Sequence, residues 1–592
     1  MISIPTWSKW SFFGSLLLTL MPFSRAQDRS LVQMFPDSTI VFAELAPASE
    51  WLNHPLRQQV QKSADFKELW RSDPIMKLRS GLMLAEFALG DTAENLLIKL
   101  TAGGLVVSID KTHQGVALVA KTESKEWLDL YLEKLVKLTR DDAEKKNEID
   151  PVKEHHYREV HAFKFNNGII AALDEFLLIT NKDTYAKEIA DRFLDRSTGG
   201  FEQTEQYKRF ADGRMRAADT PSAKEIGWLS VDVQTLREAG AAEELLGGKA
   251  KDFNAELILG GLLAILHQTP NVSGALRLSD SKISLAISSP YEPQWGGEER
   301  VFFFGEDGKG EAMPLLKTDS MIASLSAYRD VSQLWLRAGD LFDESVNDQL
   351  AQADNTLTTL FSGRDFGEDI LGAIYPEVRI VVSCQEFLET EATPAIRLPE
   401  FALVARLRNP DLMKQELKRI FQSLVGFINI TGAMNGQPQL DLDIESDAGQ
   451  QFYTSRFVRE VDRKNNVDLP VQFNFGPTIA FVNEFVVLSS TLPLTKQLAI
   501  QLKSNTQSID SQPSLLRKNT ILNVQASALK DALEVNRKQL VSQNMIENGH
   551  SKSEAESEVG SLFSILKLLD RATVDFGLDG EATLETSLYF AK

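Results

Sequence analysis

The sequence has little cysteine and little positive charge, and each shortage excludes a class of protein. Its 592 residues include one cysteine, Cys384, so no disulfide bond can form within the chain. Asp and Glu outnumber Lys and Arg by 83 to 63, and the formal net charge is −20. Such a chain is repelled by nucleic-acid phosphates and by anionic lipid surfaces. We therefore predict no nucleic-acid partner and a fold that is held together by packed cores.

Long apolar runs are also missing beyond the first residues. The segment 10–23 is apolar, follows Lys9, and precedes Ser24-Arg25-Ala26, where small residues stand at the positions required by signal peptidase. This run is shorter than the ~20 residues of a membrane-spanning helix. We predict that 1–26 is a signal peptide and that the protein is exported to the periplasm, the cell envelope or the medium. We expect no stable membrane span after cleavage, and retention of 1–26 as an anchor is the alternative.

Several short stretches occur twice along the chain in the same order. Three of the matching pairs are ALDEFLLITN (172–181) with FVNEFVVLSS (481–490), FPDSTIVFAEL (35–45) with KTDSMIASLSA (317–327), and GLVVSID (104–110) with RIVVSCQ (379–385). Chance does not preserve such an order, so we predict a tandem duplication. Each repeated half is long enough to have a core of its own.

The matches set the predicted domain boundaries. After the signal peptide, the first half is 30–290 and the second half is 317–592. The segment 291–316 between them is rich in acidic residues and glycine, and we interpret it as a linker. Its stretch VFFFG is too apolar for a free linker, so we expect it to pack against one of the halves.

Helices are expected where apolar residues recur with helical spacing. In 124–139 one face is formed by Trp127, Tyr131, Leu135 and Leu138. Ser124 precedes this segment, and its hydroxyl can accept a hydrogen bond from a free backbone N–H of the first turn. The matching segment of the second half begins with Asn409 and Pro410, which are an N-cap residue and a favoured first helical residue.

Asp174-Glu175 and Asn483-Glu484 each lie between two β-rich runs and are interpreted as hairpin turns. The repeated stretch therefore has a structural explanation, because each half needs this hairpin. Short β-rich runs follow one another through turns as often as through helices. We predict an α+β protein of two duplicated halves, each a mainly antiparallel sheet with helices packed on one face.

Four longer stretches carry a resemblance to known sequences. They are YRDVSQLWLRAGDLF (328–342), LAQADNTLTTLFSGRDFGEDILGA (350–373), LPEFALVARLRNP (398–410) and LVSQNMIENGHSKSEAE (540–556). With them the chain resembles a family of uncharacterised exported bacterial proteins that carry a domain of unknown function. The resemblance implies export and the duplicated layout. It implies no catalytic residue.

Two clusters contain residue types that bind metals. In HHYREVH, His155, Glu159 and His161 fall on one face if the segment is a single strand. The spacing is not that of a zinc-protease helix, where two histidines stand four residues apart. The second half has no matching histidines. A solvated strand face is the main interpretation, and a metal site is the alternative.

The second cluster is DLDIESD (441–447), which places Asp441, Asp443 and Glu445 at alternate positions. It lacks the glycine that a calcium-binding loop needs at its sixth position, where Ser446 stands. Leu442 and Ile444 alternate with the acids, as in a half-buried strand. A strand is again the main interpretation, and a calcium site is the alternative. We predict no cofactor.

Cys384 matches Ile109 in the first half, which favours a buried structural thiol over a nucleophile. The GxSxG and HExxH patterns are both absent from the sequence. The leading hypothesis is a non-enzymatic binding or scaffold protein of the periplasm or cell envelope, whose partner is an unknown protein or small molecule. The alternatives are an exported hydrolase with a site at the junction of the halves, and a carrier of an apolar ligand.

Overall fold

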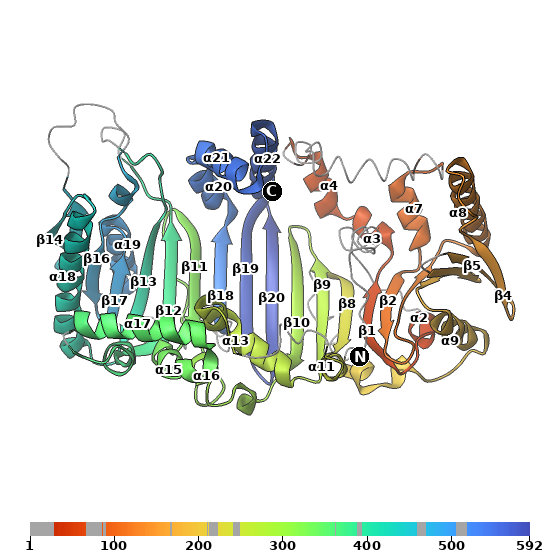
Figure 1. Ribbon diagram of the computed structural model, residues 1–592, viewed down its shortest axis with the longest axis horizontal. Helices are drawn as coiled ribbons and strands as arrows, with labels where there is room; N and C mark the ends of the chain where they lie inside the picture. The colour runs from red at the N-terminus through yellow and green to blue at the C-terminus, as the bar shows by residue number, and fades with distance from the viewer. Residues whose placement is uncertain are drawn as a thin grey trace. The chain divides into compact units, whose positions relative to one another are not determined.

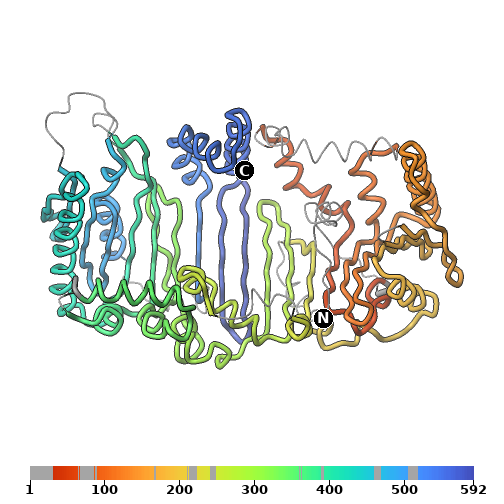
Figure 2. The backbone as a smooth tube through the Cα atoms, viewed as in Figure 1, coloured from red at the N-terminus to blue at the C-terminus, as the bar shows by residue number. Residues whose placement is uncertain are grey.

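The computed structural model describes most of the chain after residue 28 (Figures 1 and 2). The described residues are 29–64, 66, 86, 90–165, 168–209, 211, 223–240, 249–361, 363–387, 393–458, 469–504 and 518–591. The predicted signal peptide, 1–26, lies outside them. The chain divides into two compact units: unit 1 is 1–245, 269–290 and Lys592, and unit 2 is 246–268 and 291–591. Within the described ranges, no helix combines the length and the apolar character that crossing a bilayer requires.

Unit 1 is built on an antiparallel sheet. Its described strands are β1 (Thr39–Leu45), β2 (Leu105–Asp110), β3 (Gly115–Lys121), β4 (Lys153–Tyr157), β5 (Val160–Phe165), β6 (Gly168–Leu173), β7 (Phe176–Thr180), β8 (Lys224–Asp232), β9 (Asn271–Leu278) and β10 (Lys282–Pro290). Their order across the sheet is β10-β9-β8-β1-β2-β3-β7-β6-β5-β4, with antiparallel neighbours throughout. Most of these strands are rich in β-branched and aromatic residues, which favour the pleated conformation.

The helices of unit 1 lie between these strands in the sequence. Those described are α2 (Arg29–Gln33), α3 (Ala48–Leu52), α4 (Pro55–Lys62), α7 (Ala93–Leu100), α8 (Lys125–Lys145), α9 (Asp183–Leu194), the short 3₁₀ helix η2 (Phe201–Gln203) and α11 (Val233–Glu238). One core of the unit includes Phe42 of β1, which is fully buried and stacked on Phe201 with ring centroids 4.8 Å apart. Tyr185 and Ile189 of α9 belong to the same core.

Unit 2 is also built on an antiparallel sheet. Its described strands are β11 (Met321–Tyr328), β12 (Ile374–Ser383), β13 (Glu400–Leu407), β14 (Leu440–Asp447), β15 (Gln450–Phe457), β16 (Thr478–Val482), β17 (Phe485–Ser489), β18 (Lys518–Gln525), β19 (Leu569–Leu578) and β20 (Glu581–Phe590). Their order is β20-β19-β18-β11-β12-β13-β17-β16-β15-β14. Figure 2 traces the β19–β20 hairpin in dark blue.

The helical segments described in unit 2 are α13 (Phe253–Gln268), η3 (Pro293–Gly296), α14 (Val301–Phe304), α15 (Val331–Leu336), α16 (Ala338–Leu341), α17 (Glu344–Leu360), η4 (Phe366–Ile370), η5 (Leu371–Ala373), α18 (Pro410–Met434), η6 (Val471–Asn474), α19 (Leu492–Ser504), α20 (Ala526–Glu534), α21 (Arg537–Asn548) and α22 (Lys552–Leu568). In Figure 1, α20, α21 and α22 form a group at one end of the strands, and α18 stands beside β14.

The described strands of the two units follow one another in the same order across their sheets. The first strand of each unit lies between its second and eighth strands, and the third strand pairs with the seventh. Corresponding helices also recur, because α8 and α18 follow the third strand while α9 and α19 follow the seventh. The predicted α+β class and the antiparallel sheets are confirmed. The duplication itself stays a prediction.

Helices cover both faces of the sheet in unit 2, whereas we predicted one face. Phe421 and Val425 of α18 pack with Ile479 of β16, while Leu498 of α19 packs with Ala480, the next residue of that strand. Successive side chains of a strand point to opposite faces, so α18 and α19 lie on opposite sides of β16. A repeated helical pattern in the sequence does not indicate which face of a sheet a helix covers.

The segment 246–268 belongs to unit 2, although the predicted first half extends from 30 to 290. In α13, Ala264 and Ile265 are buried in one cluster with Phe303. Glu256 of the same helix lies 2.9 Å from Arg300. The predicted linker 291–316 is also part of unit 2, and its VFFFG stretch packs as expected, since Phe302, Phe303 and Phe304 are buried.

The predicted helix start at Ser124 is confirmed, because its Oγ accepts a 3.2 Å hydrogen bond from the Trp127 N–H. The helix α8 buries Leu128, Leu132 and Val136, one position away from the predicted face. Pro410 is the first residue of α18, but the Asn409 side chain makes no capping bond.

Both predicted hairpin turns are confirmed. Asp174 and Asn483 have left-handed φ values of 56° and 53° in two-residue turns, which asparagine and aspartate tolerate well.

Candidate functional site

The predicted histidine face does not form. The chain turns back at Arg158-Glu159, so HHYREVH is divided between β4 and β5 rather than forming one strand. His161 faces His156 across the hairpin, with ring centroids 4.6 Å apart, and its Nε2 lies 3.5 Å from Glu154. His155 lies on the opposite face, and Glu159 is in the turn. The prediction that His155, Glu159 and His161 share a face was therefore wrong, because we did not recognise the turn.

The acidic run lies on β14 as predicted, with Asp441, Asp443 and Glu445 on one face of the strand. Asp443 lies 3.3 Å from Arg456, and Glu445 lies 3.0 Å from Lys496. Basic side chains thus neutralise two of these carboxylates. In the described ranges, no group of three histidine, cysteine, aspartate or glutamate side chains has the arrangement of a metal site.

Cys384 is half-buried directly after β12, and its Sγ lies 3.3 Å from the Ala528 carbonyl oxygen. Burial raises the pKa of this thiol, and the nearby Asp531 and Glu400 add to the effect. A raised pKa disfavours the thiolate, which is the nucleophilic form. The structural role that we predicted for Cys384 agrees with these surroundings.

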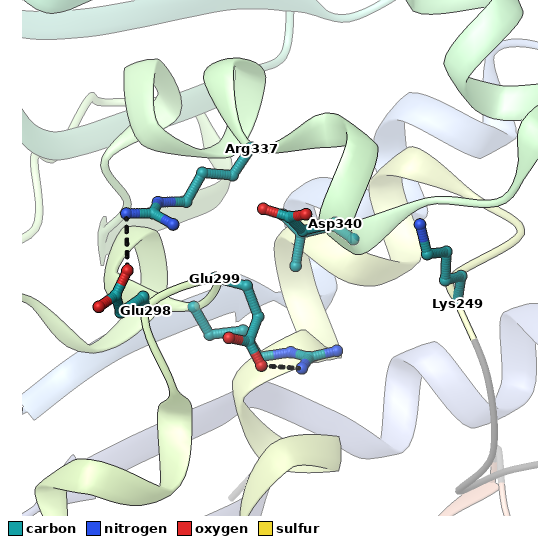
Figure 3. A pocket seen from close by; sticks show the side chains of 7 residues that line it. Lys249, Glu298, Glu299, Arg337 and Asp340 are labelled. Carbon is teal, nitrogen blue, oxygen red and sulfur yellow. Dashed lines mark ion pairs between the residues drawn. The ribbon is translucent and has the colours of Figure 1, made fainter.

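A hollow of about 520 Å³ on unit 2 is lined by charged side chains (Figure 3). Its lining consists of Lys249, Glu298, Glu299, Arg300, Arg337, Asp340 and Leu341. Arg337 lies 3.6 Å from Glu298, and Arg300 lies 3.7 Å from Glu299. The three cations and three carboxylates balance, so the hollow has no net charge with which to attract an ionic ligand.

The edge strand β14 has a different character. Among the described strands it pairs only with β15, through a hairpin that turns at Ala448-Gly449. At its start, the Asn429 side chain of α18 accepts a 2.7 Å hydrogen bond from the Leu440 N–H and donates a 2.9 Å bond to the Leu440 carbonyl. The amide of Asn429 thus replaces the backbone of a neighbouring strand at this one position.

Beyond Leu440, the backbone of β14 offers open hydrogen-bonding groups. The Val458 N–H donates to the Gln439 carbonyl, which makes Gln439 and Val458 a hydrogen-bonded pair. In an antiparallel ladder, hydrogen-bonded pairs alternate with pairs whose N–H and C=O groups point away from the partner strand. Leu442, Ile444 and Ser446 belong to the second kind, so their N–H and C=O groups point away from β15. The Ile444 N–H donates to the Asp443 carboxylate at 2.8 Å.

The two faces of β14 differ in chemistry. Leu442 and Ile444 lie on the face covered by α18, yet 43% and 52% of their surface is exposed. The opposite face presents the acidic side chains, of which Asp441 and Asp447 are exposed and have no ion pair with a described residue. An exposed edge strand is a template for pairing with another chain unless it is blocked. This edge is the candidate functional site.

An apolar patch lies on the sheet face of unit 2 away from its main core. Leu403 of β13 faces Leu488 of β17 across the ladder, and Phe401 lies two residues along β13 on the same side. All three side chains are exposed, whereas the alternate residues Ala402 and Val404 are buried in the core. We call Phe401, Leu403 and Leu488 the apolar patch.

Comparisons with known proteins add little to this description. No family model matches the chain, and no curated protein matches it. Among solved structures it is similar to crystal forms III and I of TP0453, with 7% and 8% identity and a TM-score of 0.23 for each. Both alignments cover 44% of this chain and 78% of the other. Such a score carries no argument about function.

The acidic residues of β14 were predictable from the sequence, but the features that make its edge open were not. Leu442 and Ile444 were recognised as alternating with the acids, and that pattern indicates a strand with two different faces. Nothing in the pattern places β14 at the edge of a sheet. The apolar patch was missed because β13 has apolar residues on both faces, as a fully buried strand would.

Proposed function

We propose that the protein is an exported, non-enzymatic binding or scaffold protein that binds an extended segment of another protein along the edge of β14. The observation that carries this proposal is the row of outward backbone groups on β14. They are the N–H groups of Leu442 and Ser446 and the carbonyls of Leu442, Ile444 and Ser446, since the Ile444 N–H is bonded to Asp443. An extended peptide that joins such an edge gains main-chain hydrogen bonds, and its side chains then decide specificity. The export part of the proposal rests on the predicted signal peptide, 1–26.

The two faces of β14 define the chemistry of the partner. Side chains of an added strand alternate between the faces, so every second residue lies beside Leu442 and Ile444 and the others lie beside the acidic face. Apolar residues of the added strand fit beside Leu442 and Ile444. Lys or Arg fits beside the acidic face, because opposite charges on adjacent strands stabilise pairing. The preferred partner is a segment in which basic and apolar residues alternate.

A direct test uses a synthetic peptide of sequence KVKVKVK, acetylated and amidated at its ends, with binding to the full-length protein measured by calorimetry. We expect saturable binding that weakens as salt is added, since exposed charge pairs are screened. Two control peptides replace the central valine with proline or all lysines with glutamate. Both should bind more weakly, the first through loss of an N–H and the second through repulsion.

Protein variants locate the binding edge. Leu442→Pro removes an outward N–H and leaves the ladder to β15 intact, so it should abolish binding of KVKVKVK. The matched control is His156→Pro on β4. Outward and inward N–H groups alternate along this strand, and Tyr157 pairs with Val160 beside the turn, so the N–H of His156 points away from β5. The control should bind like the wild type. Equal binding by Leu442→Pro and wild type would contradict the proposal.

The apolar patch favours a second candidate function, a carrier of an apolar ligand. Exposed aromatic and aliphatic side chains on a sheet face are a surface on which an apolar molecule can dock. N-phenyl-1-naphthylamine, a neutral fluorescent probe, should bind the wild type, and Leu403→Asn should weaken its binding. Unchanged binding by that variant would remove this candidate. The hydrolase alternative, with a site at the junction of the halves, stays a prediction.

A further inference from the structure

Arg379 of β12 is a buried cation with unsatisfied hydrogen-bond donors. Only 4% of its surface is exposed, and its Nε and Nη2 have no acceptor in the described part of the chain. Its guanidinium carbon lies 4.7 Å from the centre of the Phe485 ring. The ring attracts the positive charge but replaces no conventional acceptor, so the two N–H groups are buried at a cost in free energy.

Two further donors without partners lie on the same face of the sheet. Ser326 of β11 is directly opposite Arg379 in the ladder, and Ser324 is two residues along the strand. Because side chains alternate along a strand, the three side chains point to the same side. Both serines are buried, and neither hydroxyl has a hydrogen-bond partner among the described residues.

The positive charge of Arg379 is poorly compensated by its neighbours. Glu377 lies two residues away on β12, but Arg406 binds both of its carboxylate oxygens, at 2.6 Å and 3.3 Å. Burial is the main influence on the pKa of Arg379 and lowers it to about 10, while Glu377 raises this pKa and Arg406 lowers it. Arg379 is therefore still charged at neutral pH.

Arg329 shows how the same unit holds a buried arginine with a structural role. It is as buried as Arg379 and also lies over a ring, that of Phe303 at 3.7 Å. However, its Nε donates to the Leu257 carbonyl at 2.7 Å, and its Nη1 donates to Asn519 Oδ1 at 2.9 Å. Its Nη2 donates to a threonine hydroxyl at 3.1 Å. Every nitrogen of Arg329 has a partner, so burial alone does not explain the open donors of Arg379.

The paired stretches of the sequence have different residues at two positions of this polar cluster. In the alignment of the repeated stretches, Ser324 matches Phe42, a fully buried residue of the core in unit 1. Arg379 matches Gly104 in the same alignment. One unit thus packs an aromatic ring where the other buries the Ser324 hydroxyl, and it has no side chain where the other buries the Arg379 guanidinium. Buried polar groups without partners are rare, and each calls for an explanation.

We propose that Arg379, Ser324 and Ser326 form a binding site for a small monocarboxylate, whose oxygens accept hydrogen bonds from Nε and Nη2. These two nitrogens form the side of a guanidinium that binds a carboxylate through two parallel bonds. The serine hydroxyls can rotate to donate to its remaining lone pairs. One negative charge balances one guanidinium among apolar neighbours such as Val404, whereas a doubly charged phosphate would leave a net charge buried.

The test measures binding of sodium acetate to the full-length protein by calorimetry, with sodium chloride as the ionic-strength control and inorganic phosphate as the competing class. We expect one saturable acetate site and weaker binding of phosphate. Arg379→Lys keeps the charge but loses the paired N–H groups, so it should weaken acetate binding about tenfold or more. Arg329→Lys is the matched control and should bind acetate like the wild type.

Ser326→Ala provides a second variant in case Arg379→Lys does not fold. It removes one neutral hydrogen bond, so acetate binding should weaken about fivefold. The proposal is overturned if the wild type shows no saturable acetate binding or if phosphate binds more tightly than acetate. It is also overturned if the folded Arg379 and Ser326 variants bind acetate as the wild type does, or if Arg329→Lys weakens binding as much as Arg379→Lys.

Discussion

Asn429 of α18 forms two hydrogen bonds with the backbone of Leu440, one to its N–H and one to its carbonyl. This is the pattern by which one strand residue pairs with its opposite in a neighbouring strand. The side chain thus closes the first outward position of β14 and leaves those after it open. It also fixes the end of α18 against the strand, so the helix and the edge are positioned together.

The first prediction concerns this contact. Asn429→Asp keeps an acceptor for the Leu440 N–H but removes the donor to the Leu440 carbonyl, and we expect a loss of about 1–3 kcal/mol in the free energy of unfolding. Urea denaturation measures the change. The control is Asn435→Asp, which brings the same charge close to the end of α18 but loses only an exposed bond to Thr431. Equal losses in both variants would show that the added charge, and not the Leu440 contact, is responsible.

The second prediction compares the two helix starts. Ser124 accepts a bond from the Trp127 N–H, so Ser124→Ala should lower the free energy of unfolding by about 1 kcal/mol. Asn409 makes no capping bond, and Asn409→Ala should therefore have a smaller effect. Chemical denaturation of both variants checks this order. A larger loss for Asn409→Ala would contradict the capping geometry.

The third prediction concerns the place of α13 in unit 2. A Cβ added at Gly261 would overlap the Phe303 ring, so Gly261→Ala should cost about 1–3 kcal/mol through overpacking. Gly426→Ala in α18 is the control, since nothing lies within 4 Å of its added Cβ. That change should stabilise the protein by up to about 1 kcal/mol through helix propensity. Thermal denaturation of both variants is the measurement, and a stable Gly261→Ala variant would contradict the packing of α13 against Phe303.

The fourth prediction is a pH dependence at Glu400. Burial raises the pKa of its carboxyl above 4.5, although the hydrogen bond from Thr491 opposes the shift. The folded state therefore binds this proton more tightly than the unfolded state. The resulting stabilisation is complete below pH 4.5 and is lost as the pH rises through the folded-state pKa.

Glu400→Gln removes this titration and keeps an acceptor for Thr491. Its free energy of unfolding should exceed that of the wild type near neutral pH, and the gap should close below pH 4.5. Urea denaturation at several pH values tests the difference. Glu377→Gln is the contrast, because losing the pair with Arg406 should destabilise the protein near neutral pH. A gap for Glu400→Gln that does not change with pH would rule out titration of Glu400 as its cause.

Local features were predictable from the sequence where a single residue type determines them. The turns at Asp174 and Asn483 and the cap at Ser124 are of this kind, because side-chain chemistry and backbone conformation are coupled within a few residues. The turn at Arg158-Glu159 was missed because neither residue is a strong turn former. Its arginine is instead held by Asp191 of α9 and by Asp195 directly after that helix, a contact between segments distant in the sequence.

The sites depended even more on contacts that a single sequence does not reveal. The open edge of β14 follows from its place at the end of the sheet, and the donors of Arg379 are unsatisfied because Arg406 occupies Glu377. The paired stretches did contain one usable signal, since Ser324 stands where the first half has Phe42. Serine in place of an aromatic residue within a strand indicates that the two cores differ at that position.

Hydrogen exchange at the β14 edge tests the central claim most directly. Amide exchange of the full-length protein would be measured by NMR or mass spectrometry, with and without saturating KVKVKVK. Strand addition predicts slower exchange of the Leu442 and Ser446 amides, which point outward, and little change at Asp443, whose amide points toward β15. Binding of the peptide with no added protection at Leu442 and Ser446 would contradict the proposal that β14 is the binding edge.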